Sequence, residues 1–176
     1  MKKALIVVDM QNDFISGALG SAEAQAIVPA VCEKIRSWDG IVYYTKDTHT
    51  AEEYLNSTEG KDLPVSHCLS GSHGWNLHPE IMSALIDHGG HLRPVCKDCF
   101  GSHPLARNIL SEECDYVELI GLCTDVCVIS NAIIIRNSDP YIRVAVDASC
   151  CAGVTPERHH IALQAMQNCG IQVINA

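Results

Sequence analysis

The sequence predicts an α/β fold in which helices cover both faces of a mostly parallel sheet. Two observations carry this prediction. Short apolar runs alternate along the chain with segments that have helical features, which is typical of βαβ units. In addition, the runs ALIVV (4–8) and YVELI (116–120) are apolar or nearly so at successive positions, as in strands that are buried on both faces.

Most of the apolar runs are interpreted as strands. They lie at 4–8, 41–45, 91–95, 116–120, 141–146 and 171–174. Helical segments begin at Pro29, Leu77, Thr124 and Thr155, and residues 46–76 form a long, polar, loop-rich connection of the kind that often carries function.

The segment from Thr155 has the clearest helix boundaries. Thr155 can serve as the N-cap, Pro156 suits the first helical position, and Gly170 stands where a C′ residue would.

Composition narrows the class of protein. A chain of 176 residues with 47% hydrophobic residues can build its core without disulfides, so we expect one soluble domain over residues 1–176, with its ten cysteines reduced in the cytoplasm. Asp9 interrupts the first apolar run too early for a signal peptide, and no segment approaches the ~18 apolar residues of a membrane span. The net charge of −9, with Lys and Arg scattered, argues against nucleic acid as a partner.

Chemically active side chains follow several of the predicted strands. Asp9 follows the first run, Asp47 and His49 follow the second, Lys97 follows the third, and GLCTDVCV (121–128) follows the fourth. Ligands of open α/β sheets bind beyond the carboxyl ends of the strands. We therefore expect a carboxylate, a lysine and a cysteine to meet at one rim.

Two cysteines in GLCTDVCV compete for the role of nucleophile. With Thr124 as N-cap, Cys127 lies at about the third position of an apolar helix, where free N–H groups and the helix dipole favour a thiolate and Lys97 would lower the thiol pKa further. Cys123 precedes the cap, so its side chain gains less, although its N–H could help to hold an oxyanion. The pattern favours Cys127.

The remaining cysteines have simpler interpretations. Five are interpreted as packing residues: Cys32, Cys114, Cys150, Cys151 and Cys169. Cys96 and Cys99 form a C-x-x-C pattern that could be a redox pair or half a zinc site, but the expected end of the strand at Val95 and the lack of a clear second C-x-x-C weaken both interpretations.

Taken together, the motifs resemble those of the nicotinamidase-like cysteine amidohydrolases of the isochorismatase-like superfamily. The segments that carry the resemblance are VVDMQNDFISGALG, TKDTH, LPVSHCLSG, LHPEI, KDCFGS, GLCTDVCV and VDAS. They occur in the same order as in that family, mostly after successive strands, and they extend over nearly the whole chain.

The resemblance implies a three-layer sandwich around a six-stranded parallel sheet and a catalytic triad of Asp9, Lys97 and Cys127. Asp9 would be the general base, Lys97 would support the thiolate, and Cys127 would attack an amide carbonyl. The backbone N–H groups of Cys123 and Cys127 would hold the oxyanion. The family also tends to have a cis peptide bond at the position of Leu122–Cys123.

The resemblance also implies a divalent metal, with zinc preferred over iron or manganese, held by Asp47, His49 and His67. The alternative is that His49 and His67 are ordinary loop residues among the nine histidines.

The motifs indicate less clearly which residues contact the substrate. Phe14 and Phe100 offer aromatic surfaces for a flat ring. Leu63 and Pro64 stand where nicotinamidases commonly have a tryptophan.

The expected activity is hydrolysis of a small primary amide to the acid and ammonia, with nicotinamide as the first substrate to test, by a homo-oligomer. An N-carbamoyl compound with the same triad is an alternative. Isochorismatase activity is disfavoured because those enzymes cleave a vinyl ether and lack the nucleophilic cysteine. A non-catalytic protein that binds metal through its thiols is a third interpretation, and it predicts that alkylation of Cys127 leaves the function intact.

Overall fold

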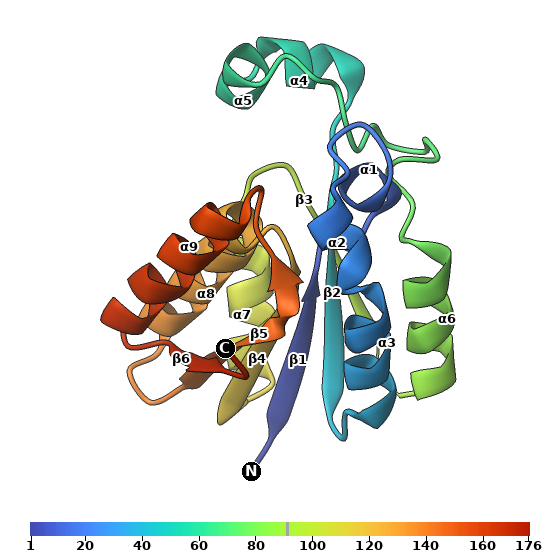
Figure 1. Ribbon diagram of the computed structural model, residues 1–176. Coiled ribbons are helices and arrows are strands. Elements are labelled where there is room, and N and C mark those ends of the chain that lie inside the picture. The colour runs from blue at the N-terminus through green and yellow to red at the C-terminus, as the bar shows by residue number, and fades with distance from the viewer. Residues whose placement is uncertain (91) are drawn as a thin grey trace.

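The computed structural model describes residues 1–90 and 92–176. Six parallel strands form one sheet in the order β3-β2-β1-β4-β5-β6 (Figure 1). The strands are β1 (Lys3–Val8), β2 (Ile41–Asp47), β3 (Leu92–Lys97), β4 (Tyr116–Leu122), β5 (Arg143–Ala152) and β6 (Gln172–Ile174). The predicted α/β fold with a parallel sheet is confirmed.

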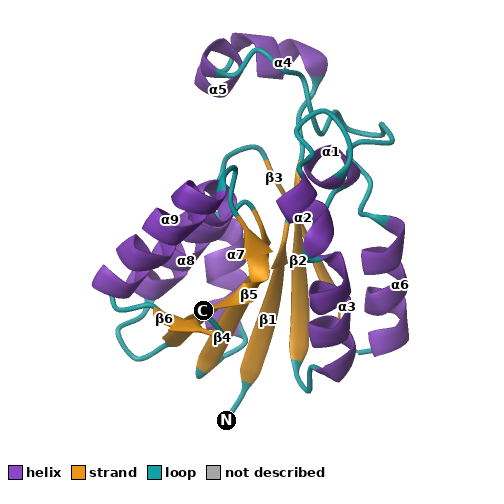
Figure 2. Cartoon of the chain, in the orientation of Figure 1, coloured by secondary structure: helices purple, strands orange, loops and turns teal. Residues whose placement is uncertain are grey.

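Helices form a layer on each face of the sheet (Figure 2). One layer contains α3 (Val28–Ser37) and α6 (Pro79–His88); the other contains α7 (His103–Ser111), α8 (Ile129–Ser138) and α9 (Pro156–Asn168). A π-helical turn, η1 (Thr124–Val128), leads directly into α8. The short helices α1 (Asn12–Ile15), α2 (Ala22–Ala26), α4 (Ala51–Asn56) and α5 (Thr58–Asp62) lie toward the carboxyl ends of the strands, with α4 and α5 beyond them (Figure 1).

The central strand β1 packs on both helical layers. Ala4, Ile6 and Val8 belong to the cluster that includes residues of α7, α8 and α9, whereas Leu5 and Val7 belong to the cluster that includes residues of α3 and α6. All five are fully buried, and burial of each larger aliphatic side chain stabilises the fold by about 1.5–3 kcal/mol. This burial on both faces explains the uninterrupted apolar run.

Four strands, β2 to β5, continue further than the sequence predicts, and β4 reaches Leu122 and β5 reaches Ala152. β2 ends at Asp47 and β3 ends at Lys97, and these two residues are paired in the parallel register. The predicted end of the third strand at Val95 is therefore wrong, and His91, at the start of that predicted run, lies outside the described residues. As a result, Asp47 and Lys97 are held by the sheet rather than by loops.

The helix boundaries are partly as predicted. The Thr155 side chain accepts a hydrogen bond from the Arg158 N–H at the start of α9, and Gly170 follows the helix with a φ of +76°. The prediction that Thr124 is an N-cap is wrong, because the turn begins at Thr124 itself and Cys123 occupies the cap position. The connection at 46–76 contains α4 and α5, and α7 was not predicted. In the described part of the chain, no helix combines the length and hydropathy needed to cross a bilayer.

Candidate active site

Asp9 lies immediately after β1, where the sheet order places β1 beside β4. Its φ of +46° is unusual for a residue with a side chain and directs the chain out of the strand. The Asp9 N–H donates to Thr45 Oγ1 at 3.1 Å, and the Thr45 hydroxyl donates to Asp9 Oδ1 at 2.6 Å. The neighbouring strand β2 therefore fixes a fully buried carboxylate at the carboxyl end of the sheet.

Lys97 reaches this carboxylate from β3. Its Nζ lies 2.7 Å from Asp9 Oδ2, 3.3 Å from Asp47 Oδ1 and 3.6 Å from Cys127 Sγ. Burial alone would lower the pKa of Lys97, but the charges of Asp9, Cys127 and Asp47 raise it well above its ordinary value. Lys97 is therefore a permanent ammonium in contact with three partners.

Cys127 completes the cluster from η1. It is 5% exposed, its Sγ lies 3.6 Å from Lys97 Nζ, and the Asp9 carboxylate is near enough to act on the pKa of the thiol. Burial raises the pKa of Cys127, Lys97 lowers it, and the carboxylates Asp9 and Asp47 raise it again, so the net pKa is well above the ordinary value. The predicted lowering of the Cys127 pKa is wrong, since burial and two carboxylates outweigh the ammonium. Burial likewise raises the pKa of Asp9 against the opposing charge of Lys97.

Cys123 is built into the same turn but lies in a different environment. The peptide bond Leu122–Cys123 is cis, as the resemblance implied. Burial raises the pKa of the Cys123 thiol to about 12, and none of the hydrogen bonds found for the described side chains joins it to Asp9 or Lys97. Of the two cysteines, only Cys127 has a hydrogen bond to the ammonium of Lys97, which also pairs with Asp9, and this is the arrangement that an activated thiol needs.

All ten cysteines are free thiols. Cys32, Cys114, Cys150 and Cys151 are buried, as expected for packing residues, whereas Cys169 is exposed, so its interpretation as buried packing is wrong. Cys96 and Cys99 are exposed, and Cys99 lies in the cavity wall described below.

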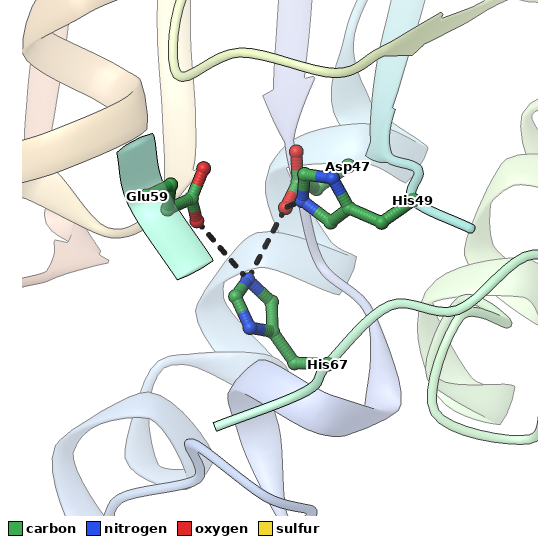
Figure 3. Close-up of side chains that lie close together, drawn as sticks. All are labelled: Asp47, His49, Glu59 and His67. Atoms are coloured by element: carbon green, nitrogen blue, oxygen red, sulfur yellow. Dashed lines mark hydrogen bonds and ion pairs between the residues drawn. The ribbon is translucent and has the colours of Figure 1, made fainter. Parts of the chain in front are cut away.

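A second cluster, next to the first, contains Asp47, His49, Glu59 and His67 (Figure 3). The potential ligand atoms of these four side chains all lie within 4.8 Å of one another. His49 Nε2 is 2.9 Å from Asp47 Oδ2, and His67 Nε2 is 3.4 Å from both Asp47 Oδ2 and Glu59 Oε1. Two imidazoles and two carboxylates in this arrangement can hold a divalent metal.

The surroundings of this cluster fit a metal ion. His67 Nδ1 is 2.9 Å from the Val65 carbonyl, which orients the ring so that Nε2 faces the carboxylates. Burial would lower the pKa of His67, but hydrogen bonding to Asp47 and Glu59 raises it to about 10. A divalent cation would compete with that proton, because imidazole binds metals in its neutral form.

Glu59 is the member of the cluster that the sequence did not predict. It lies on α5, inside the long connection, and its carboxylate approaches His67 from the side opposite Asp47 and His49 (Figure 3). No short spacing links Glu59 to Asp47 or His67, so its place in the cluster depends on the fold of residues 50–66. The only signal in the sequence was the length and polarity of that connection.

Both clusters open into one cavity of about 1050 Å³. Cys123 and Cys127 form part of its wall, and so do the two predicted aromatic residues, Phe14 and Phe100. The Phe14 ring meets the His67 ring edge to face with 5.4 Å between centroids, and Phe100 is 43% exposed. The cavity is mostly apolar, with a reactive thiol at one side and imidazole and carboxylate groups at another, which suits a small aromatic or polar ligand.

Comparisons with known proteins agree with this arrangement. A family model described as the isochorismatase domain matches residues 3–176. Nicotinamidase from Acinetobacter baylyi is 30% identical over 98% of this chain and 92% of that protein. The crystal structure of nicotinamidase from Bacillus subtilis superposes with a TM-score of 0.86 at 25% identity, covering 98% of this chain and 99% of that one. Pyrazinamidase from Pyrococcus horikoshii in complex with zinc gives a TM-score of 0.79 at 25% identity, with both chains covered completely.

Proposed function

The chain belongs to the isochorismatase family, and from this we propose that it hydrolyses a small primary amide to the acid and ammonia through a thioester on Cys127. The observation that carries the proposal is one buried thiol, Cys127, 3.6 Å from the ammonium of Lys97, which pairs with the Asp9 carboxylate at 2.7 Å. The nicotinamidase and pyrazinamidase relatives make nicotinamide and pyrazinamide the first substrates to test.

In the first half of the reaction, Asp9 removes the proton from the Cys127 thiol as sulfur attacks the amide carbon. The carbonyl π electrons move to oxygen, and the backbone N–H groups of Cys123 and Cys127 receive this oxyanion. Protonated Asp9 then donates its proton to the nitrogen as the C–N bond breaks, so ammonia leaves and the thioester remains. Lys97 stays protonated throughout and keeps one negative charge stable, whether that charge is on Asp9 or on sulfur.

The second half repeats the proton transfers with water. Asp9 takes a proton from a water molecule whose oxygen attacks the thioester carbonyl, and the second tetrahedral intermediate is held by the same N–H groups. When the C–S bond breaks, sulfur regains the proton from Asp9 and the carboxylic acid is released. The high pKa of Cys127 supports this sequence, because a thiol that rests protonated needs a nearby base to remove its proton.

The metal cluster supplies the other end of the substrate site. Asp47, His49, Glu59 and His67 would hold a divalent cation, and we propose zinc because two imidazoles and two carboxylates match its ligand preferences. When bound, this cation offers a Lewis-acidic position to a heteroatom of the substrate. Phe14, in contact with His67, would then support the face of an aromatic ring.

The proposal is tested by ammonia release from nicotinamide, pyrazinamide and N-carbamoyl compounds, with and without a chelator. We expect Cys127→Ala and Asp9→Asn to abolish turnover, while Cys123→Ala keeps most of it, since only its backbone N–H takes part. A Cys123→Ala variant without activity, beside an active Cys127→Ala variant, would mean that the wrong sulfur has been chosen. No ammonia release from any of these substrates, together with metal binding that is unchanged after alkylation of Cys127, would favour the non-catalytic metal-binding protein.

The substrate screen also separates the two amidase alternatives. Turnover of N-carbamoyl compounds with little turnover of nicotinamide would favour the carbamoyl alternative with an unchanged triad. The homo-oligomer, the cytoplasmic location and the single domain over residues 1–176 stay predictions; light scattering of the purified protein tests the first.

A further inference from the structure

One buried side chain joins the two segments that carry Cys127 and Lys97. Asn131, on α8, is fully buried, and its Nδ2 donates to the Cys127 carbonyl at 2.8 Å and to the Phe100 carbonyl at 3.1 Å. Its Oδ1 accepts from the Ser102 N–H at 2.9 Å. The amide group thus makes one bond to η1, here called the nucleophile turn because it carries Cys127. It makes two bonds to the loop after Lys97, residues 98–102.

We propose that Asn131 is a positioning residue. By bonding to both segments, it fixes the distance between the nucleophile turn and the loop that follows Lys97. This inference rests on the proposed roles of Cys127 and Lys97. Asn131 does not line the cavity and does not touch the thiol through its side chain, so it acts through the residues that it holds.

The chemistry of the position supports a specific role. The helix α8 is rich in isoleucine around Asn131, and a buried amide in such surroundings is costly unless its donors and acceptor are paired. Here Nδ2 has two carbonyl partners and Oδ1 has an N–H partner. An asparagine with no role beyond its own helix can bond only to the carbonyl four residues earlier. Asn137 on the same helix does this, donating to the Ile133 carbonyl at 2.8 Å.

The loop that Asn131 holds is packed closely against α8. At Gly101, between the two bonded residues, an added Cβ would lie 3.3 Å from Cβ of Ser130, so the loop approaches the helix at a distance that a side chain would disturb. Ser102 is also the N-cap of α7, because its hydroxyl accepts from the Leu105 N–H. Asn131 therefore fixes both the course of this loop and the point at which α7 begins.

Two parts of the active site depend on this loop. Lys97 ends β3 just before it, and the 3.6 Å separation between Lys97 Nζ and Cys127 Sγ changes if the turn and the loop move apart. Phe100 belongs to the loop and lines the cavity. A displacement of about 1 Å between reacting groups can cost about 100-fold in rate.

The test compares Asn131→Leu and Asn131→Ser with the control Asn137→Ser. Leucine has a similar size and removes all three bonds. Serine can still donate to the carbonyl four residues earlier, as Ser130 does to Val126 at 2.6 Å, but it is too short to reach the loop. The control makes the same Asn-to-Ser change on the same helix, where serine can keep the bond to the carbonyl four residues earlier and no link to the loop is lost. Each variant is assayed for kcat, KM, thermal unfolding midpoint and the rate at which iodoacetamide alkylates Cys127.

We expect kcat/KM to fall about 10- to 100-fold in Asn131→Leu and less in Asn131→Ser, with a changed alkylation rate and a higher KM for aromatic amides. The control should match the wild type in all kinetic readouts. If Asn131→Leu is poorly folded by circular dichroism, Asn131→Ser decides the question. A folded Asn131 variant with a lower unfolding midpoint but wild-type kcat, KM and alkylation rate would overturn the inference, because Asn131 would then serve only stability. Ammonia release by Cys127→Ala, in contrast, would refute the proposed function itself.

Discussion

Replacement of Lys97 by methionine removes a cation that contacts both Asp9 and Cys127. An ion pair at the observed 2.7 Å is worth about 6 kcal/mol at an effective dielectric constant of about 20. This energy favours the charged form of Asp9 by about 10,000-fold, against burial and the charge of Asp47, which both raise the pKa of Asp9. Without Lys97, Asp9 should be protonated at neutral pH and should fail as a base.

The predicted result for Lys97→Met is a loss of about 1,000-fold or more in kcat/KM at pH 7, together with a shifted pH profile. Activity needs the carboxylate form of Asp9, so it rises as pH increases through the pKa of Asp9. A higher pKa in the variant therefore moves this rise to higher pH, and part of the activity should return in alkaline buffer.

Ammonia release across the pH range measures both effects, with Lys46→Met as the control. Lys46 lies at the end of β2, next to Asp47, but its ammonium lies over the Trp75 ring, so its loss should leave the profile unchanged. A Lys97→Met variant within tenfold of the wild type at pH 7, with its acidic limb in the wild-type position, would refute this reasoning.

Three further predictions concern the metal cluster and the stability of the fold. His49→Ala should raise KM more than it lowers kcat, if the metal mainly positions the substrate, and kinetics on metal-loaded protein check this. Glu59→Gln should lower the zinc affinity about tenfold or more, measured by competition with a chromogenic chelator; an unchanged affinity would remove Glu59 from the ligand set. Lys34→Met should destabilise the protein by about 3 kcal/mol in urea titrations, because it leaves the buried carboxylates of Glu118 and Asp147 without their cation; a change below about 1 kcal/mol would contradict this.

The same ion pair gives a pH dependence of stability. Burial raises the pKa of Asp147, but hydrogen bonding from Lys34 and other donors lowers it below its ordinary value. A carboxyl group with a lowered pKa in the folded state contributes stability above its unfolded pKa and loses it as pH falls through the folded pKa. The wild type should therefore lose this contribution only in acid, and Lys34→Met should show a smaller loss there.

The sequence predicted the parts of the site that follow directly from strands. Asp9 and Lys97 were found because apolar runs locate the strands, and parallel strands bring their carboxyl ends to one edge of a sheet. Cys127 was preferred to Cys123 on its place in the following helix, and this choice agrees with the contacts of the two thiols, although the cap residue was wrong by one position.

The rest of the site depends on tertiary contacts that no local pattern encodes. The high pKa of Cys127 results from burial and from the carboxylates of Asp9, just after β1, and Asp47, at the end of β2, whereas the sequence argument for the thiol pKa considered only the helix and Lys97. Glu59 and Asn131 are brought to their partners by the fold of a long connection and by a loop that crosses α8. Asn131 lies at helical spacing from Cys127, but its bonds to Phe100 and Ser102 follow from no spacing in the sequence.

The most direct measurement is mass spectrometry of the protein quenched in acid during turnover of nicotinamide or pyrazinamide, followed by peptide mapping. The expected result is an acyl group, of the mass of the acid less water, on the peptide that contains Cys127 and on its sulfur, with none on Cys123. Steady ammonia release with no acyl adduct on any cysteine, or with the adduct on Cys123, would contradict a mechanism in which Asp9 and Lys97 activate Cys127.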